Sequence, residues 1–209
     1  MWYLLGARIA WLLLWRIKVI GKENIPSHGP LIIVVNHQSF ADGILLGVIF
    51  LSISRLHFFA KKQLFKYRPI RWILKKWNLH PINREGRDIN AVRLALQLLE
   101  QKHMIVVIPE GHRSKDGVLQ KGKEGAAYLA TKTGVPVLPI GVERTGGNLL
   151  KILCTFPRIT IRIGMPITVQ NIQGDPSNII QENIHKRIMY AIAVLLPYDQ
   201  RGAYSIPIA

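Results

Sequence analysis

The stretch that decides the fold is Leu31 to Leu46, LIIVVNHQSFADGILL. It begins with a short aliphatic run directly after Gly29-Pro30, and this pattern predicts a buried strand. The strand ends where the polar residues begin, and a helix is expected to start near Ser39. His37 therefore falls beyond the carboxyl end of a strand, the place where open α/β sheets bind their ligands.

Asp42 follows His37 by five residues, and the local sequence leaves two interpretations open. In the first, the Asp42 carboxylate lies in the first helical turn and reaches back to the imidazole. It then keeps one ring nitrogen protonated and leaves the other able to accept a proton. In the second, Ser39 and Asp42 form a capping box, and His37 is an ordinary, partly buried histidine.

The composition indicates one globular domain that attracts anions. With 209 residues the chain can bury one substantial core. Its formal net charge of +16 favours nucleic acid, anionic lipid or phosphorylated substrates as partners. The single cysteine, Cys154, excludes an internal disulfide and is interpreted as a small core residue. The histidines outside the motifs lack the spacing of metal ligands, so no metal is expected.

Residues 1–18 are predicted to form an amphipathic helix that associates with a membrane. The longest uninterrupted apolar run, Ile9 to Trp15, is much shorter than the ~20 residues that span a bilayer. Basic residues fall on one half of the helix, and tryptophans and leucines cover most of the rest, as at a membrane interface. The alternative is a first helix packed on the core, but so many large apolar groups are hard to bury in a small domain.

A second basic region runs from Arg55 to Arg87, where Glu85 is the one acidic residue among many lysines and arginines. Large apolar side chains such as Trp72 and Trp77 are interleaved with the cations. Three interpretations remain open for this region. It presents cations to an anionic membrane, or it is a solvated basic face, or it binds nucleic acid with aromatic platforms.

The rest of the chain alternates strand and helix patterns, which predicts a single α/β domain at residues 19–196. Buried strands are expected at 31–35, 56–60, 104–108 and 135–142, and a half-exposed strand at 159–163. Helices are expected at 88–102 and 122–133 and from 175 to Pro197, followed by a loose tail to residue 209. Pro136 and Pro139 suggest that their strand lies at an edge of the sheet or ends irregularly.

Four motifs occur in a fixed order along this domain. They are Asn36-His37 with Asp42, Pro81-Ile82-Asn83-Arg84, Pro109-Glu110-Gly111-His112-Arg113-Ser114 and Val135-Pro136-Val137-Leu138-Pro139. Together they resemble the blocks of the glycerolipid acyltransferases, and the resemblance runs from about Gly21 to Ile163. The chain departs from the family pattern at His112, where a threonine is usual, and at Asn78-Leu79-His80, where a glycine is missing.

The resemblance implies a central mixed sheet flanked by helices, like that of glycerol-3-phosphate acyltransferase. It also implies transfer of a fatty acyl group from a thioester, acyl-CoA or acyl-carrier protein, to the sn-2 hydroxyl of 1-acyl-glycerol-3-phosphate (lysophosphatidic acid). The product would be phosphatidic acid, and no cofactor beyond the co-substrate would be needed. The implied location is the cytoplasmic face of an anionic membrane, with peripheral or monotopic attachment.

Within that chemistry, His37 is expected to be the general base on the acceptor hydroxyl, and Asp42 to orient it. Ser39 as an acylated intermediate is a less favoured alternative.

The acceptor phosphate needs cations, and the resemblance assigns this role to Arg84 and Arg113, with Lys61 adding charge. On sequence alone, an ion pair of Arg113 with Glu110, or of Arg84 with its neighbour Glu85, is an equal alternative. Glu110 is expected to orient an arginine or to hydrogen-bond the glycerol, and Gly111 to allow close backbone approach.

Other functions remain open. The acceptor could be another lysophospholipid, glycerol 3-phosphate or an aminoacyl lipid. From different classes, the chain could be a basic nucleic-acid-binding module or an inactive membrane-binding scaffold. The tryptophan-rich N-terminus and the buried polar loops argue against nucleic acid, which is not expected as a partner.

Overall fold

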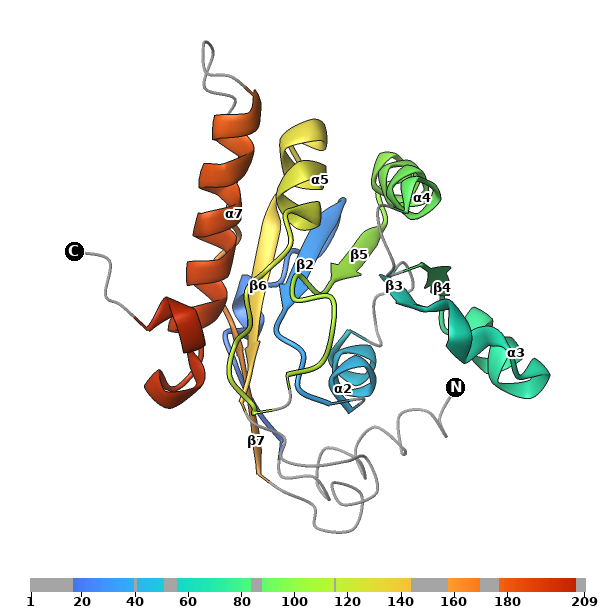
Figure 1. The fold of residues 1–209 in the computed structure, drawn as a ribbon, viewed down its shortest axis with the longest axis horizontal. Coiled ribbons are helices and arrows are strands. Elements are labelled where there is room, and N and C mark those ends of the chain that lie inside the picture. The colour runs from blue at the N-terminus through green and yellow to red at the C-terminus, as the bar shows by residue number, and fades with distance from the viewer. Residues whose placement is uncertain are drawn as a thin grey trace.

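A mixed β-sheet forms the centre of the protein. The computed structural model describes residues 17–39, 41–50, 56–83, 88–114, 116–143, 158–169 and 177–205 (Figure 1). Within these ranges, seven strands form one sheet in the order β1-β7-β6-β2-β5-β3-β4. Their bounds are β1 Ile17–Ile20, β2 Leu31–Val35, β3 Leu56–Lys61, β4 Leu79–Ile82, β5 Met104–Val107, β6 Val137–Val142 and β7 Ile159–Ile163. The helix predicted at the N-terminus lies outside the described residues up to position 16, and residues 17 and 18 belong to β1.

Strand β2 occupies the middle of the sheet, and all of its residues are buried. It is parallel to both of its neighbours, β5 and β6, and β3 and β4 continue the parallel part. Strand β7 runs antiparallel to β6, and β1 is parallel to β7, so the predicted mixed sheet is confirmed. Because β2 and β5 end at the same edge, the polar segments that follow them in sequence are brought together.

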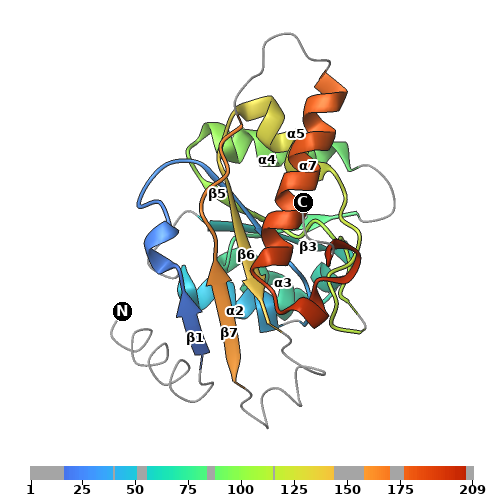
Figure 2. The ribbon, with the colours of Figure 1, turned by 90° about the vertical axis from the view of Figure 1, so that its left-hand side faces the viewer.

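Helices cover both faces of the sheet (Figures 1 and 2). Helix α2 (Ala41–Ile49) packs on one face, where Leu31, Ile33 and Val35 of β2 point. Helices α4 (Ile89–Glu100), α5 (Gly125–Thr133) and α7 (Ser177–Val194) pack on the other face. Helix α5 approaches closely because its inward residues are small and fully buried, namely Ala126, Ala127 and Ala130. Both faces of β2 are therefore covered, which explains its continuous apolar sequence.

Of the two alternatives predicted for the strand that contains Pro139, an edge position or an irregular end, the edge position is wrong. Strand β6 lies between β7 and β2 and is buried along its whole length. The carbonyl of Pro139 accepts a hydrogen bond of 2.9 Å from Gly164, the residue just beyond the end of β7. The N–H and C=O groups of one residue in a strand point to the same neighbouring strand, so both positions of Pro139 face β7. Because β7 ends at Ile163, proline takes no N–H from the ladder of hydrogen bonds between the two strands.

The basic region folds into elements that the sequence pattern did not predict. After β3 come the 3-10 turn η2 (Lys62–Phe65), helix α3 (Arg68–Lys76) and β4, the last strand of the sheet. Figure 1 shows α3 outside β4, at the margin of the molecule. Pro69 is tolerated because it stands in the first helical turn, and Asn78, with φ 53°, turns the chain into β4. None of the helices in the described ranges is long and apolar enough to cross a bilayer.

The residues after Pro197 pack on the domain, so the expected loose tail is wrong for positions 198–205. They form two 3-10 turns, η3 (Tyr198–Gln200) and η4 (Gly202–Tyr204). The carbonyl of Gln200 accepts a hydrogen bond of 2.8 Å from the N–H of Leu119. Gly202 has a φ of 55°, and a Cβ atom there would lie 2.2 Å from the Leu119 carbonyl oxygen. Only glycine fits this approach.

Candidate active site

His37 and Asp42 are in direct contact beyond the end of β2. Nδ1 of His37 lies 3.0 Å from Oδ2 of Asp42, and the two residues are 8% and 1% exposed. The same carboxylate oxygen accepts the backbone N–H groups of Gln38 at 2.7 Å and Ser39 at 2.8 Å. Because a carboxylate only accepts, Nδ1 must donate to it, and Nε2 carries the lone pair that accepts a proton.

The structure contains both the contact of Asp42 with His37 and part of the capping box. Asp42 lies in the first turn of α2, and its own N–H donates to the Ser39 carbonyl over 3.3 Å. Its carboxylate accepts the Ser39 N–H, which is the backward half of a capping box. The Ser39 hydroxyl donates to Oδ1 of Asp42 at 3.4 Å and is buried at 2% exposure. One carboxylate therefore caps the helix and orients the imidazole, and the Ser39 hydroxyl is poorly placed for a nucleophile.

Glu110 joins the two polar segments that follow β2 and β5. It is 1% exposed, and its Oε1 accepts the backbone N–H of His37 at 2.6 Å. Its Oε2 accepts the backbone N–H of Gln120 at 2.8 Å. Burial raises the pKa of Glu110 to about 7, and the two backbone N–H groups limit the rise. Both carboxylate oxygens thus have partners inside the protein.

Asn36 makes a matching connection to the other neighbour of β2, and sequence reasoning gave it no role beyond its place in the motif. Its Nδ2 donates to the carbonyl of Val142 at 2.9 Å, and its Oδ1 accepts the N–H of Val142 at 2.8 Å. The side chain is 1% exposed and pairs with the last residue of β6. The sequence showed only that a polar residue follows an apolar run, and this pattern does not predict that the residue pairs with Val142.

The segment from Glu110 to Ser114 runs beside His37. The N–H of Ser114 donates to the His37 carbonyl at 2.8 Å, which places the neighbouring Arg113 next to the site. Arg113 and His112 are both exposed. Gln38 continues the contact, since its Nε2 donates to the Gly117 carbonyl at 3.2 Å.

A family model described as Acyltransferase matches residues 16–143. This is more than half of the chain, and it includes all of the His37, Asp42 and Glu110 contacts described above. The chain belongs to the acyltransferase family. The matched residues include the first motif, Asn36-His37 with Asp42, and the third motif, which begins at Pro109.

Several relatives in this family resemble the chain over the same region. A chloroplastic 1-acyl-sn-glycerol-3-phosphate acyltransferase of Brassica napus is 35% identical over 136 residues, which are 63% of this chain. The enzyme of that name from Bacillus subtilis is 30% identical over 151 residues, which are 72% of this chain and 73% of the relative. The chain spans only 38% of the length of the Brassica relative.

A solved structure shows the same fold. The crystal structure of the 1-acyl-sn-glycerophosphate (LPA) acyltransferase PlsC from Thermotoga maritima matches with a TM-score of 0.62 and 27% sequence identity. The match covers 87% of this chain and 74% of the other. The acyltransferase-like fold that was expected from the sequence is therefore confirmed.

The other residues predicted for this acyltransferase site lie in different places. Lys61 is exposed and ends β3, at the same edge of the sheet as His37. Gly111 has a φ of 72°, so glycine is favoured there by backbone conformation. Arg84 and Cys154 lie outside the described residues. In the part of the chain that the structure describes, no group of three or more His, Cys, Asp or Glu side chains could hold a metal ion.

An apolar cavity of about 220 Å³ adjoins the Glu110 segment, and no sequence motif pointed to it. It lies on the face of the sheet that α4 and α5 cover. Its apolar walls include Phe59, Ile82, Val92, Ala95, Val107 and Leu129. Pro109 and Gly111 line it as well, so the cavity borders the segment that contacts His37.

Proposed function

We propose that the protein transfers a fatty acyl group from a thioester to the sn-2 hydroxyl of 1-acyl-sn-glycerol 3-phosphate, forming phosphatidic acid. The observation that carries this proposal is the contact between His37 Nδ1 and Asp42 Oδ2 at the end of the central strand. It fixes an imidazole whose Nε2 can act as a base, in a chain whose relatives carry the name of this activity. The donor would be acyl-CoA or acyl-carrier protein.

The reaction needs one base and no enzyme nucleophile. Nε2 of His37 takes the proton of the acceptor hydroxyl while that oxygen attacks the thioester carbonyl carbon. The tetrahedral intermediate then collapses, the C–S bond breaks, and the imidazolium gives its proton to the departing thiolate. The products are the new ester and the free thiol, and His37 returns to its starting state. Asp42 stabilises the imidazolium throughout, as the carboxylate of a Ser-His-Asp triad does.

Glu110 is assigned here to positioning. Its two oxygens hold the N–H groups of His37 and Gln120, so it fixes the backbone from which the imidazole projects. A further contact of Glu110 with an arginine or with the glycerol, as expected from the sequence, stays a prediction.

Arg113 is the described residue best suited to the acceptor phosphate. It is exposed, and it precedes Ser114, whose N–H donates to His37. A guanidinium binds phosphate through two parallel hydrogen bonds, so it would hold the glycerol hydroxyl in one orientation relative to the base. Lys61, at the same edge of the sheet, adds positive charge, and Arg84 is proposed as the second phosphate-binding arginine.

The apolar cavity between α4 and α5 is proposed to take part of an acyl chain. Its walls are mostly apolar, with Asn83 and Lys123 among the lining residues, and Pro109 and Gly111 line it next to the segment that contacts His37. An acyl chain buried there gains the hydrophobic free energy of its methylene groups. We propose that the enzyme works as a peripheral or monotopic protein at the cytoplasmic face of the membrane.

An acyl-transfer assay across a panel of acceptors tests the proposal. The purified full chain is given acyl-CoA or acyl-carrier protein with 1-acyl-glycerol-3-phosphate, glycerol 3-phosphate, lysophosphatidylcholine or an aminoacyl lipid. Phosphatidic acid should be the main product, and His37→Ala should lower kcat at least about 10²–10⁴-fold, the usual contribution of a general base.

The matched control is His112→Ala, which removes an exposed histidine from the neighbouring segment. It should retain most of the activity. Full activity of His37→Ala would overturn the mechanism, and preference for an acceptor without a phosphate group would overturn the proposed substrate.

A further inference from the structure

Helix α3 and the turn before it form a strongly cationic surface far from the catalytic residues in sequence. Residues 56–83 contain no Asp or Glu. Their basic residues are Lys61, Lys62, Lys66, Arg68, Arg71, Lys75 and Lys76, and all are exposed. We define the α3 surface as the exposed side chains of residues 64–77. No acidic side chain of this segment offsets its charge, so the surface attracts polyanions.

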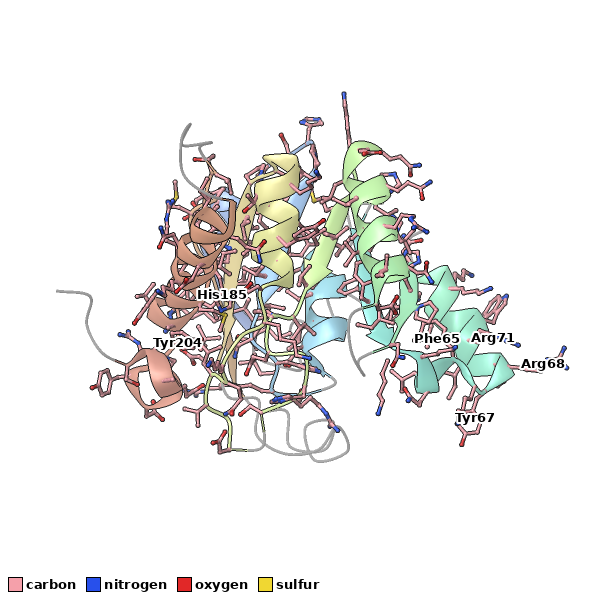
Figure 3. The ribbon with its side chains drawn as sticks, turned by 45° about the horizontal axis from the view of Figure 1, so that its top comes forward. Phe65, Tyr67, Arg68, Arg71, His185 and Tyr204 are labelled. Atoms are coloured by element: carbon pink, nitrogen blue, oxygen red, sulfur yellow. The ribbon has the colours of Figure 1, made fainter. Side chains whose placement is uncertain are left out.

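Large aromatic side chains stand among these cations. Tyr67 is 68% exposed and Trp72 is 66% exposed, whereas Phe65 is buried. Figure 3 shows Tyr67 and Arg68 pointing away from the body of the protein at the far end of α3. Burying such rings in the core is the usual outcome, so their exposure beside cations marks a contact surface.

The spacing within α3 puts the Trp72 ring and several charges on one face. Arg68, Trp72 and Lys75 are separated by four and three residues, so they form one stripe along the helix. The ammonium group of Lys76 lies 5.1 Å from the centre of the Trp72 ring. A tryptophan ringed by basic side chains matches the level of lipid headgroups, where the ring meets acyl chains and the cations meet phosphates.

From these features we infer that the α3 surface docks on an anionic membrane. Nucleic acid would also suit the charge and the rings, but aliphatic side chains favour lipid. Leu64 is 36% exposed and Ile70 is 43% exposed beside the same cations. Neither offers a π-face to a base, and both can be buried among acyl chains.

The docking would serve the site described above, so this inference deepens the proposed function and rests on it. The turn η2 begins directly after Lys61, the last residue of β3. Strands β3, β5 and β2 are parallel, so the α3 surface begins at the edge of the sheet where His37 lies. A membrane held by this surface would be next to the edge from which a lipid acceptor enters.

Vesicle flotation of the full chain tests the inference. The vesicles are phosphatidylcholine with about 30% phosphatidylserine, and each basic residue near such a surface changes partitioning about fivefold. Arg68→Gln/Lys75→Gln/Lys76→Gln should therefore weaken partitioning roughly 100-fold. The matched control, Lys102→Gln/Lys132→Gln/Arg187→Gln, removes three exposed cations elsewhere and should partition like wild type, apart from a small long-range effect.

Quenching by lipids brominated on their acyl chains gives an independent readout. If Trp72 enters the interface, Trp72→Phe removes a quenched component of the emission, even if another segment also anchors the chain. Equal partitioning of the triple variant and its control, together with unchanged quenching in Trp72→Phe, would overturn the inference. Displacement of the protein from vesicles by a single-stranded oligonucleotide that binds the α3 surface more tightly would reassign the surface to nucleic acid.

Activity measurements separate this inference from the proposed function. On a monomeric short-chain acceptor in solution, the triple variant should retain wild-type acyl transfer. On acceptor embedded in anionic vesicles, its rate should fall with its partitioning. If wild type transfers no acyl group in either assay, the proposed function fails while the vesicle result still decides the docking.

Discussion

Oε1 of Glu110 lies 2.6 Å from the backbone nitrogen of His37 and accepts its hydrogen bond. The two residues are 73 positions apart, and each follows the end of a buried parallel strand. The contact fixes the backbone of His37, the proposed general base, through a carboxylate that takes no part in the proposed proton transfer. It therefore predicts that activity depends on a residue that need not touch the substrate.

Replacing Glu110 by glutamine should impair both stability and catalysis. The amide has one acceptor oxygen, so either the buried N–H of His37 or the partly buried N–H of Gln120 loses its partner. An unsatisfied buried donor costs about 1–3 kcal/mol, which urea denaturation would detect. The activity should fall because the His37 backbone is no longer fixed. Glu100→Gln, at an exposed carboxylate, is the control and should change neither.

The pH dependence of unfolding distinguishes an effect of the Glu110 charge from an effect of its packing. The pKa of Glu110 is raised from 4.5 to about 7 in the folded protein, so the folded state binds more protons between these values. Its contribution to stability is then present below pH 4.5 and is lost as the pH rises to about 7. Glu110→Gln should abolish this part of the pH dependence. An identical pH profile of wild type and variant would contradict the assignment.

The substitution Asp42→Asn should lower kcat by about 10³–10⁴-fold with a smaller change in the acceptor KM. Oδ2 of Asp42 is the partner of Nδ1 of His37 and of two backbone N–H groups. An amide oxygen in its place carries no charge to stabilise the imidazolium, and an amide nitrogen in its place would donate to Nδ1 and favour the other tautomer. Helix α2 also loses part of its cap, at a cost of about 1 kcal/mol. Steady-state kinetics give the first effect and thermal unfolding the second. Asp199→Asn is the exposed control, and a variant with near-normal kcat would remove Asp42 from the mechanism.

The sequence predicted the centre of this fold because its signals there are local. The β2 run, the start of α2 and the N-cap at Asp88 each depend on neighbouring residues. Asp88 does accept the N–H of Ala91 at 3.0 Å. His37 and Asp42 are five residues apart, so their contact could be predicted from the local sequence for the same reason.

Features that depend on strand order were beyond the sequence. Asn36 pairs with Val142, 106 residues away, and no periodicity names such a partner. Pro139 suggested an edge because the early end of β7 cannot be read from β6. Helix α3 was not assigned from the sequence because cations and large apolar residues alternate throughout Arg55 to Arg87, and this mixture left three interpretations of the region open. The cavity arises where α4 and α5 pack side by side, and packing is not written in any single motif.

Arg113→Ala should raise the KM for the acceptor at least about tenfold and leave the KM for the thioester donor nearly unchanged. The loss corresponds to one charge-assisted pair with phosphate, worth about 1.5–3 kcal/mol. Arg113→Lys keeps the charge without the paired hydrogen bonds, so its KM for the acceptor should lie between those of the wild type and Arg113→Ala. Arg187→Ala, on the exposed side of α7, is the control. Equal effects on both substrates would exclude Arg113 from the phosphate site.

Asn36→Ala should destabilise the protein by on the order of 2–4 kcal/mol, because it leaves the buried N–H and C=O of Val142 without their partners. The urea midpoint of unfolding measures the change. Asn90→Ala, on the exposed side of α4, should stay within about 0.5 kcal/mol of wild type. A small effect of Asn36→Ala would mean that water replaces the amide between β2 and β6.

Acid should weaken the far edge of the sheet through a cluster of histidines. The ring of His57 stacks on His103, with centroids 4.7 Å apart, and its Nδ1 lies 2.9 Å from Nε2 of His80. Burial, followed by the proximity of His103 and His80, lowers the pKa of His57 to about 4. The unfolded chain therefore binds a proton at His57 below pH 6.5, whereas the folded chain does not until about pH 4.

The stability that His57 contributes is thus complete above pH 6.5 and is lost as the pH falls toward 4. Between pH 7 and pH 5 the loss should be on the order of 1–2 kcal/mol. His57→Gln, which cannot titrate, should flatten the pH dependence of the urea midpoint over this range. The control is His28→Gln, at an exposed ring, which should leave the slope unchanged. A wild-type slope in His57→Gln would show that other groups govern the acid sensitivity of this fold.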